Sequence, residues 1–405
     1  MVKLAMIGAG GYAFNLIKWI WEIPDQISLA AVSSNPSRHS PGRSACLEKG
    51  VPVYDDTDAL LTNIKGKADV VYVPTPINTH FSLAKKCIDA GFDVFLEKPP
   101  VATIQELDEL IKYVSQKGKS IPVAFQYLHS SIVQQLKKQI VEGRFGKVKR
   151  VKGMAGWPRF DSYYSRSEWA GKLRLDNEWI LDGTINNPLA HMLADQLYLA
   201  SQESDKMAEP VSVEAELYRA HNIESEDTSS LRIITEKGAE VLFNTTLCSD
   251  TKIDTLVTIE CEKAVIFYSA FCKAEIKFAD GRIEKIEDNA EKRVYMLKNL
   301  AERYAAKKPY LVSLETCRPF MLVVNGAFDC VGVPYAIDKK FLTYSIEQEP
   351  AGQTIKTVIN DIDSILKEAN EQGKLFSEIG AKWASKARKI DLKGYKQFPS
   401  FAKFD

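Results

Sequence analysis

The amino-acid sequence predicts an α/β Rossmann domain followed by an α+β domain with an open antiparallel sheet. Up to about residue 125, short apolar runs alternate with amphipathic segments, which is the pattern of parallel strands covered by helices. Later segments alternate in polarity and are joined by turns such as Asp280-Gly281, which is typical of antiparallel hairpins. A chain of 405 residues exceeds one ordinary core, so we expect two domains, 1–126 and 127–405.

The first domain is expected to alternate strands with helices. Its strands are predicted at residues 2–7, 27–32, 68–73, 93–96 and 122–125, and its helices at 12–23, 79–90 and 104–117. In the second domain we expect helices at 132–141, 291–306 and 354–370. The last of these is predicted from Ile355, Val358, Ile359, Ile362 and Ile365 at helical spacing. Strands are expected at 148–154, 211–218, 229–235, 239–246, 256–260, 264–268, 273–278 and 282–286.

Composition excludes several classes of partner. Lysine plus arginine and aspartate plus glutamate both total 53, so the charge gives no reason to expect a nucleic acid. The absence of an apolar run of about 18 residues argues against a membrane span, and the protein is expected in the cytoplasm. The seven cysteines are scattered without a C-x-x-C pair, and with five histidines they show no metal-ligand spacing, so no metal is expected.

A glycine turn follows the first expected strand. Gly8-Ala9-Gly10-Gly11-Tyr12-Ala13 fits G-x-G-x-x-A between a strand and a helix. Gly8 permits a tight turn, Gly10 lets the backbone approach a pyrophosphate, and Ala13 lets the helix pack closely on the strand. The anion then lies on free N–H groups at a helix N-terminus. The turn therefore predicts a bound nicotinamide dinucleotide.

The residues after the second strand bear on which dinucleotide is bound. An acidic residue about 20 positions after the glycines usually binds the ribose of NAD. Here the chain offers Ser33, Ser34, Asn35 and Arg38 and no carboxylate. Such residues suit a 2′-phosphate, so the sequence favours NADP.

Glu97-Lys98-Pro99 lies at the carboxyl end of a parallel strand. That edge of an open α/β sheet lines the ligand crevice. A lysine beside a cationic nicotinamide has its charged form disfavoured, so it can exchange a proton with a substrate hydroxyl near neutral pH. The alternative from the residues alone is a surface lysine paired with Glu97.

Together these motifs resemble the Gfo/Idh/MocA oxidoreductases. The resemblance rests on the glycine turn, on Thr75-Pro76 followed by His80, on Glu97-Lys98-Pro99 and on Gly143-x-x-Gly146. It covers about residues 1–330 and implies an NAD(P)-dependent dehydrogenase of sugars or cyclitols. It also implies that Lys98 assists catalysis and that the open sheet forms a homodimer or homotetramer. The expected cofactor contacts are Gly8, Gly10, Gly11, Tyr12, Ala13, Ser33, Ser34, Asn35, Arg38, Pro74, Thr75, Pro76, Asn78, His80, Glu97, Lys98 and Gln126.

The second half of the site departs from the family pattern. The family usually has D-x-x-x-H here, and His191 matches the histidine whereas Asn187 stands in place of the aspartate. An imidazole accepts a hydroxyl proton, but an asparagine only orients a substrate. Asp195, one helical turn after His191, is expected to orient it, and Asp182 is also near in sequence. The expected catalytic residues are Lys98, His191, Asn187 and Asp195.

An aromatic and basic segment precedes His191. Arg159, Tyr164, Arg166 and Trp169 are expected to line a carbohydrate pocket with Lys98, Asn187 and His191, because aromatic faces and guanidinium forks suit sugars and sugar acids. A packed cover is the alternative. His221 is weighed as a substrate contact against a solvated loop residue. The family's arginine after residue 125 is missing, and His129 is a candidate replacement.

The sequence leaves three functions open. The first is an NAD(P)-dependent oxidoreductase that transfers hydride between nicotinamide and a hydroxyl or keto carbon of a sugar, cyclitol or sugar acid. The second is a sensor of the same fold that binds cofactor or sugar without turnover. The third is a cofactor-assisted glycosidase or lyase. Asn187 keeps the last two open, because it cannot take up a proton.

Overall fold

The computed structural model describes residues 1–37, 40–401 and 403–404. Arg38, an expected cofactor contact, lies outside them. The chain forms two compact units. The N-terminal unit comprises Met1–Ala102, Glu106–Ser130 and Ala290–Cys317, and the C-terminal unit comprises Thr103–Gln105, Ser131–Asn289 and Arg318–Asp405.

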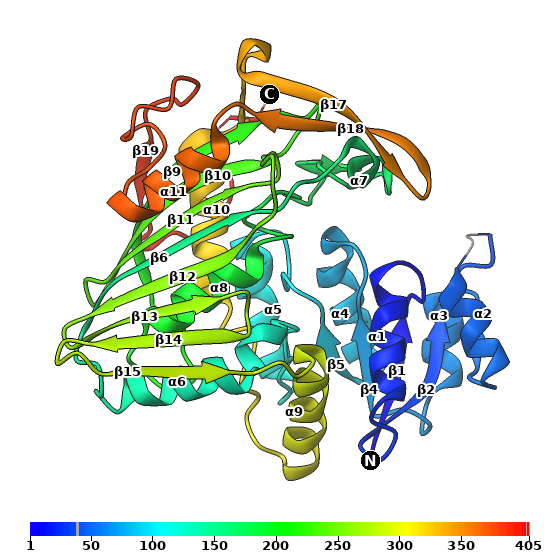
Figure 1. The fold of residues 1–405 in the computed structure, drawn as a ribbon. Helices are drawn as coiled ribbons and strands as arrows, with labels where there is room; N and C mark the ends of the chain where they lie inside the picture. The colour runs from blue at the N-terminus through cyan, green and yellow to red at the C-terminus, as the bar shows by residue number, and fades with distance from the viewer. Residues whose placement is uncertain (38–39, 402, 405) are drawn as a thin grey trace. The chain divides into compact units, whose positions relative to one another are not determined.

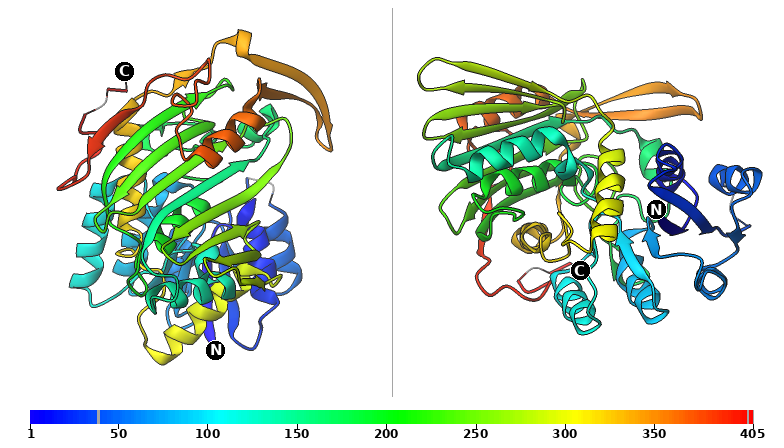
Figure 2. Two further views of the ribbon diagram at one scale, coloured as in Figure 1. Left: turned by 60° about the vertical axis from the view of Figure 1, so that its left-hand side comes forward. Right: turned by 90° about the horizontal axis from the view of Figure 1, so that it is seen from below.

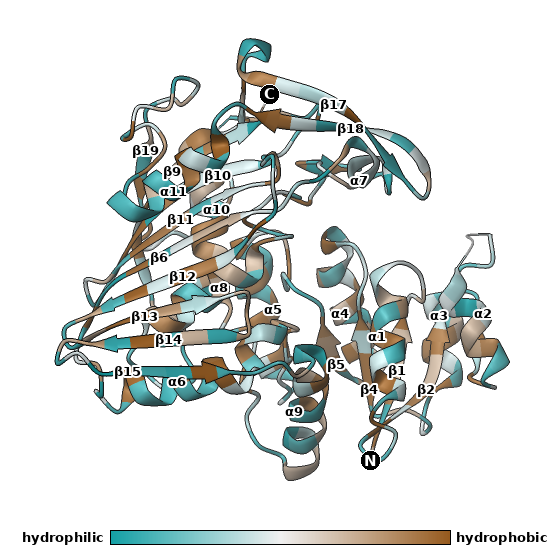
Figure 3. Cartoon of the chain, viewed as in Figure 1, coloured by the Kyte–Doolittle hydropathy of each residue, from teal (hydrophilic) through white to brown (hydrophobic). Residues whose placement is uncertain are grey.

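The N-terminal unit is built on a parallel sheet in the order β3-β2-β1-β4-β5. The strand order reverses between β1 and β4, and a crevice at the carboxyl ends of strands at such a point is the usual ligand site. Figure 3 shows β1 and β4 in hydrophobic brown, as expected for strands covered on both faces. The strands are β1 (Val2–Ile7), β2 (Ile27–Ser33), β3 (Val53–Tyr54), β4 (Val70–Val73) and β5 (Asp93–Leu96). The helices are α1 (Tyr12–Trp21), α2 (Pro41–Glu48), α3 (Thr57–Asn63), η1 (Ile77–Thr79), α4 (His80–Asp89), α5 (Ile104–Gln116), η2 (Gln126–His129) and α9 (Lys292–Ala306).

Two expectations for this unit are corrected. Residues 122–125 form no strand, only an isolated parallel bridge from Val123 to Leu96 and an antiparallel one from Pro122 to Ser313. The proline lacks the N–H that a ladder needs, and Val123 donates its N–H to Val312 instead. In addition, α9 belongs to this unit although it lies far beyond residue 126. Its buried face joins the core formed by β1 and α1.

The C-terminal unit contains a ten-stranded, mostly antiparallel sheet in the order β15-β14-β13-β12-β6-β11-β10-β9-β16, with β19 paired to β9. Its strands are β6 (Val148–Gly156), β9 (Pro210–Arg219), β10 (Thr228–Thr235), β11 (Glu240–Thr246), β12 (Ile253–Cys261), β13 (Ala264–Ser269), β14 (Lys273–Phe278), β15 (Ile283–Glu287), β16 (Tyr335–Ala336) and β19 (Arg388–Asp391). Two small sheets pair β7 (Arg174–Leu175) with β8 (Glu178–Trp179) and β17 (Leu342–Glu349) with β18 (Gly352–Ile359). Its helices are α6 (Ser131–Val141), α7 (Asp161–Ser165), α8 (Ala190–Ala200), α10 (Arg318–Val331), η3 (Lys339–Phe341) and α11 (Ile362–Gln372).

Helices cover both faces of the large sheet at β6 (Figure 2). On one face, Gly153 of β6 lies against Gln196 of α8, and an added Cβ would come within 2.7 Å of that side chain. On the other face, the ammonium of Lys152 lies 3.5 Å from the Glu371 carbonyl at the end of α11. Successive strand residues point to opposite faces, so β6 serves both helices. The sheet thereby supports α8, which carries His191.

The expected helix at 354–370 is wrong. Residues 352–359 form β18, and α11 begins only at Ile362. Asp361 between them has a φ of 62°, in the left-handed region, which ends the strand before the helix starts. The β-branched residues of this segment favour a strand, and the helical spacing of its isoleucines outweighed that signal in the sequence analysis.

Within the described residues, no helix is both long and apolar enough to cross a bilayer.

Buried polar contacts secure the ends of several helices. The most extensive is at the C-terminus of α8. There the buried Lys137 of α6 donates to the carbonyls of Tyr198, Ser201 and Lys206, at 2.7, 2.7 and 3.0 Å. Lys137 thus satisfies carbonyl groups that a helix end leaves without partners.

We predict that Lys137→Met lowers the free energy of unfolding by about 3 kcal/mol, because three buried carbonyls lose their donor. Chemical denaturation monitored by circular dichroism measures the change. The matched control is Lys138→Met, since Lys138 is the next residue along α6 and its side chain is 75% exposed. Equal stability of the two variants would contradict this role for Lys137.

Candidate functional site

The glycine turn connects the end of β1 to the start of α1. Gly8 has a φ of 102° and Gly11 a φ of 53°, backbone angles that residues other than glycine rarely adopt. Gly11 is the N-cap residue of α1, and no side chain caps the helix there. Among the described residues, the N–H groups of Gly10, Gly11 and Tyr12 donate no hydrogen bond. They are therefore available to bind an anion at the positive end of the helix.

Helix α2 supports this turn from the side. A Cβ on Gly42 would come within 2.0 Å of the Ala9 carbonyl oxygen and 3.1 Å of the Phe14 ring. Ser40 caps α2 through its side chain, and a Cβ on Gly10 would lie 3.7 Å from its hydroxyl. The sequence analysis missed Gly42, because a glycine within a helix shows its contact only once the fold is known.

The residues after β2 form a polar corner. Ser34 donates its N–H to the Tyr54 carbonyl at 2.8 Å, and its own carbonyl accepts from the Arg43 guanidinium. Arg43 also pairs with Asp55 at 2.9 Å. The sequence analysis missed both partners, and Asp55 is a carboxylate that follows the neighbouring strand rather than β2 itself.

Buried contacts hold the Thr75-Pro76 and Glu97-Lys98-Pro99 turns together. His80 is fully buried, and its ring nitrogens lie 2.9 Å from the Pro99 carbonyl and 2.8 Å from the Thr75 carbonyl. Burial lowers its pKa to about 4, and the hydrogen bonds to these carbonyls raise it in part. His80 thus links the Thr75-Pro76 turn to the Glu97-Lys98-Pro99 turn.

Glu97 is buried beside the lysine. It accepts a 2.6 Å hydrogen bond from the Tyr72 hydroxyl and a 3.0 Å bond from the Lys98 backbone N–H. Burial raises the pKa of Glu97, and the charge of Lys98 lowers it in part. Because Tyr72 is fully buried in β4, this pair fixes the turn that carries Lys98 at the carboxyl edge of the sheet.

A third cluster of the N-terminal unit joins α1 to η2 and α9. The Tyr12 hydroxyl donates to the Gln126 side chain at 3.0 Å and accepts from Arg293 at 3.2 Å. Arg293 was missed because it lies 281 residues from Tyr12. His129, the candidate replacement donor, is buried in the same unit, and burial lowers its pKa to about 3.

These features fit a dinucleotide. The uncapped α1 provides N–H donors for a pyrophosphate. The positive φ at positions 8 and 11 favours glycine, which has no side chain to cover these N–H groups. In addition, the buried Asn78 Oδ1 in η1 has no hydrogen-bond partner among the described residues, so a polar group of a ligand is expected there. The expected contacts therefore gather at the carboxyl end of the sheet.

In the C-terminal unit, the loop before α8 contains a hydrogen bond between Asp182 and Asn187. The Asn187 Nδ2 donates to Asp182 Oδ1 at 2.7 Å. The other carboxylate oxygen of Asp182 accepts from the Gly171 N–H at 2.7 Å and lies 3.7 Å from the Arg166 guanidinium. A carboxylate accepts hydrogen bonds only, so the amide nitrogen of Asn187 must face Asp182 and its Oδ1 points elsewhere as an acceptor.

A second buried carboxylate, Glu226, supports the same loop. It accepts from the Ile185 N–H at 3.0 Å and the Thr184 hydroxyl at 3.2 Å. A Cβ on Gly183 would overlap the carboxylate, at 1.6 Å from its oxygen. Burial raises the pKa of Glu226 to about 7. The loop conformation therefore depends on both Asp182 and Glu226.

Asp195 and His191 lie one turn apart on α8, and both are buried. The Asp195 Oδ2 accepts a hydrogen bond from the Tyr268 hydroxyl at 3.4 Å. Burial raises the pKa of Asp195 well above its usual value, which favours the neutral carboxyl over the carboxylate. A neutral Asp195 does not stabilise an imidazolium by charge.

The aromatic and basic residues expected to line the pocket form a stacked cluster. The Arg166 guanidinium lies 3.6 Å from the centre of the Tyr163 ring and 4.9 Å from that of Trp169. Arg159 lies 4.9 Å from the Tyr163 ring, and Tyr164 packs on that ring edge-on. Such faces suit carbohydrate binding and also stabilise the loop itself.

The N-terminal unit matches a known family. Residues 2–125 match the model of GFO_IDH_MocA, described as an oxidoreductase family with an NAD-binding Rossmann fold. D-glucoside 3-dehydrogenase of Escherichia coli is 29% identical over 167 residues, which are 39% of this chain and 46% of that protein. The chain thus spans about half the length of the curated relatives it matches.

Solved structures share the fold over most of the chain. The WlbA dehydrogenase of Bordetella pertussis, in complex with NADH and UDP-GlcNAcA, has a TM-score of 0.67 at 23% identity, covering 83% of this chain and 99% of that one. An inositol dehydrogenase homologue from Azotobacter vinelandii, with NADH and myo-inositol, has a TM-score of 0.66 at 16% identity, covering 80% and 94%. The N-terminal unit therefore has the Rossmann fold that these proteins share.

We predict that Gly42→Ala weakens NADH binding at least about tenfold, because the new methyl group displaces the Ala9 carbonyl and distorts the glycine turn. Titration of NADH fluorescence measures the change. Ser44→Ala, on an exposed position of the same helix, is the control. Unchanged affinity in a folded Gly42→Ala variant would show that α2 does not shape the turn.

Proposed function

We propose that the protein oxidises or reduces a carbohydrate with a nicotinamide cofactor. The premise is the match of residues 2–125 to the GFO_IDH_MocA oxidoreductase family. The substrate class is a sugar, cyclitol or sugar acid with a reactive hydroxyl or keto carbon. The observation that carries the proposal is the fixed position of Lys98, on a turn secured by His80, Glu97 and Tyr72 at the carboxyl edge of the sheet.

Lys98 and His191 are proposed to handle the hydroxyl proton. When bound, the nicotinamide accepts or donates the hydride at its C4 atom. The Lys98 amine and the His191 imidazole take up the proton as the alcohol becomes a ketone, and return it in the reverse direction. Arg159, Tyr164, Arg166 and Trp169 are proposed to bind the remainder of the sugar through stacking and charged hydrogen bonds.

Asn187 is proposed to act as a hydrogen-bond acceptor in place of the family's aspartate. Because its Nδ2 donates to Asp182, the Asn187 Oδ1 faces away from that carboxylate, and we propose that it accepts from a substrate hydroxyl. Asp182 keeps a negative charge next to this group, in a buried position. The pair thus provides both functions of the missing carboxylate. Asn187 accepts the hydrogen bond, and Asp182 carries the negative charge.

A substrate screen tests the proposal. Polyols, sugars and sugar acids are incubated with NAD⁺ or NADP⁺, and the absorbance of the reduced nicotinamide is followed. We expect turnover with at least one compound and its loss in Lys98→Ala with cofactor binding retained. Cofactor binding without turnover on any compound would favour a sensor. Cleavage of a glycoside without net reduction would favour the glycosidase or lyase.

We predict that Asn187→Asp lowers the turnover number at neutral pH by at least about tenfold. Its new carboxylate would lie about 2.7 Å from Asp182, and two such groups do not both ionise. The double variant Asp182→Asn with Asn187→Asp reverses the pair and is expected to recover part of the loss. Steady-state kinetics of both variants test this. A gain in activity from Asn187→Asp alone would contradict the proposed role of Asp182.

The corner after β2 is proposed to favour NADP. Arg43 lies against the Ser34 carbonyl, and Ser33, Ser34 and Asn35 offer uncharged polar groups beside it. A guanidinium suits a 2′-phosphate. Asp55 neutralises Arg43 in part, at 2.9 Å. The pairing of two copies through the open sheet stays a prediction.

We predict that Arg43→Met weakens NADPH binding about tenfold while NADH binding changes by less than about twofold, because one charged hydrogen bond to the 2′-phosphate is lost. Fluorescence titrations with both cofactors give the ratio. Asp55→Asn is the companion variant, and it is expected to strengthen NADPH binding. An equal loss for both cofactors would place Arg43 in support of the turn alone.

A further inference from the structure

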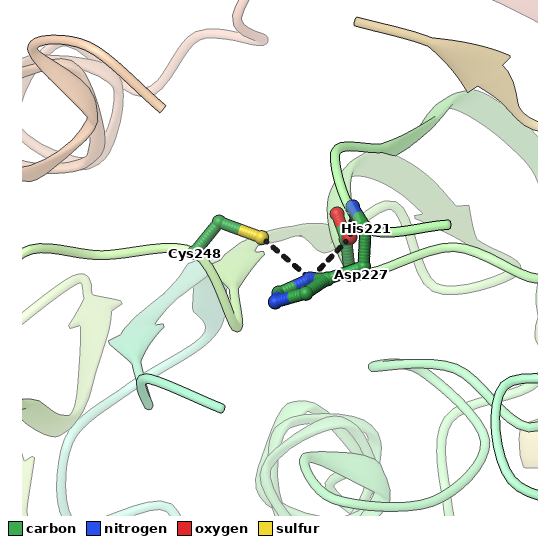
Figure 4. Close-up of side chains that lie close together, drawn as sticks. All are labelled: His221, Asp227 and Cys248. Atoms are coloured by element: carbon green, nitrogen blue, oxygen red, sulfur yellow. Dashed lines mark hydrogen bonds and ion pairs between the residues drawn. The ribbon is translucent and has the colours of Figure 1, made fainter. Parts of the chain in front are cut away.

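Three residues at the ends of three strands meet at one end of the large sheet of the C-terminal unit (Figure 4). His221 follows β9, Asp227 precedes β10 and Cys248 follows β11. The register that pairs Thr228 with Thr246 brings Asp227 and Cys248 to the same strand ends. All three side chains are buried, and their ligand-type atoms lie within 4.8 Å of one another.

The ring of His221 faces acceptors on both sides. Its Nε2 lies 3.2 Å from the Arg159 carbonyl, which only accepts, so Nε2 carries a proton. Its Nδ1 lies 2.9 Å from Asp227 Oδ2 and 3.3 Å from Cys248 Sγ. In a neutral ring the Nδ1 lone pair therefore points at a carboxylate, and either a proton or a metal ion between Nδ1 and Asp227 would remove that conflict.

Among the described residues, no lysine or arginine pairs with Asp227. Its carboxylate is held by the backbone N–H groups of Ala220 and His221 and by the Thr228 hydroxyl. These bonds orient the carboxylate, as the partners of a metal-binding carboxylate usually do. A ligand histidine likewise donates its second ring N–H to a backbone carbonyl, as His221 does to Arg159.

A fourth polar group borders the cluster. The Tyr164 ring lies 4.8 Å from that of His221, and its buried hydroxyl has no hydrogen-bond partner among the described residues. An unsatisfied buried hydroxyl on a ring that packs against His221 indicates a missing partner.

We propose that His221, Asp227 and Cys248 bind a zinc-class divalent metal ion. Imidazole nitrogen, thiolate sulfur and carboxylate oxygen are the ligands that zinc prefers, at about 2.0, 2.3 and 2.0 Å. Those bond lengths imply ligand separations of roughly 3.3–3.7 Å. The distances from His221 Nδ1 to Asp227 Oδ2 and Cys248 Sγ, 2.9 and 3.3 Å, are within a few tenths of an ångström of that range. The Tyr164 hydroxyl or a water molecule takes the fourth tetrahedral position.

Metal binding is expected to release one proton. The ion displaces the thiol proton of Cys248, and Asp227 and His221 bind it as a carboxylate and a neutral imidazole. The ion would pin the ends of β9, β10 and β11 and, through Nε2 of His221, the Arg159 backbone. The proposed role is to stabilise this end of the sheet, and the ligands His221, Asp227 and Cys248 take no part in the hydride chemistry proposed above.

Metal analysis of the purified full-length protein is the first test. We expect about one zinc ion per chain by elemental mass spectrometry. After treatment with a chelator, zinc chloride should raise the midpoint of thermal unfolding and magnesium chloride should not, because a thiolate and an imidazole select the softer ion. A folded protein that neither contains zinc nor gains stability from it would overturn the proposal.

Cobalt substitution tests the ligands directly. Co²⁺ bound to a thiolate gives an intense charge-transfer absorption, which we expect in the wild type and not in Cys248→Ser. Cys330→Ser, another buried thiol of the same unit, is the matched control and should keep the band. Tyr164→Phe should keep it with altered ligand-field bands if Tyr164 binds the ion.

The absence of the band from folded, cobalt-treated wild type would overturn the proposal, as would its persistence in Cys248→Ser. If Cys248→Ser fails to fold, the wild-type band and its loss in His221→Gln decide. Substrate turnover is measured in parallel. Loss of metal with turnover intact separates this site from the proposed catalytic function.

Discussion

A carboxylate accepts hydrogen bonds but never donates one, and this constraint at Asp182 determines what the loop before α8 presents. Asp182 receives the Asn187 amide on one oxygen and the Gly171 N–H on the other. The orientation of Asn187 is therefore fixed, with its carbonyl oxygen as the remaining acceptor. We propose that Asn187 and Asp182 together take the role of the aspartate that the resemblance leads one to expect at position 187.

The N-terminal unit follows the same principle, since buried partners hold each exposed functional group. His80 joins two turns through their carbonyls, and Tyr72 orients Glu97 below Lys98. Gly42 lets α2 pack so closely on the glycine turn that no side chain fits between them. Ligand contacts gain their precision from these supporting residues, because a loosely held group loses much of its effect on binding and catalysis.

The sequence predicted the parallel sheet, the antiparallel strands and the glycine turn because each depends on local pattern. Asp93–Leu96 and Lys273–Phe278 have the predicted bounds. It failed at residues 354–370, where helical spacing and β-branched composition disagree, and at α9, whose partner core lies nearly 300 residues away in the chain.

Site residues divide in the same way. Lys98 and His191 belong to short motifs, whereas Gly42, Arg43, Arg293 and the Asp182–Asn187 pair act through contacts that only the fold creates. The cysteine and histidine spacing predicted no metal site. It could not reveal His221, Asp227 and Cys248, because strand pairing rather than spacing brings them together.

Transfer of deuterium tests the central claim of hydride chemistry most directly. The protein is incubated with NAD⁺ or NADP⁺ and with sugars, cyclitols and sugar acids that carry deuterium on carbon, in ordinary water. Mass spectrometry of the cofactor then shows where the label goes. The account predicts reduced cofactor that contains one deuterium atom from the substrate. Reduced cofactor without the label, or bound cofactor that stays oxidised with every compound, would contradict it.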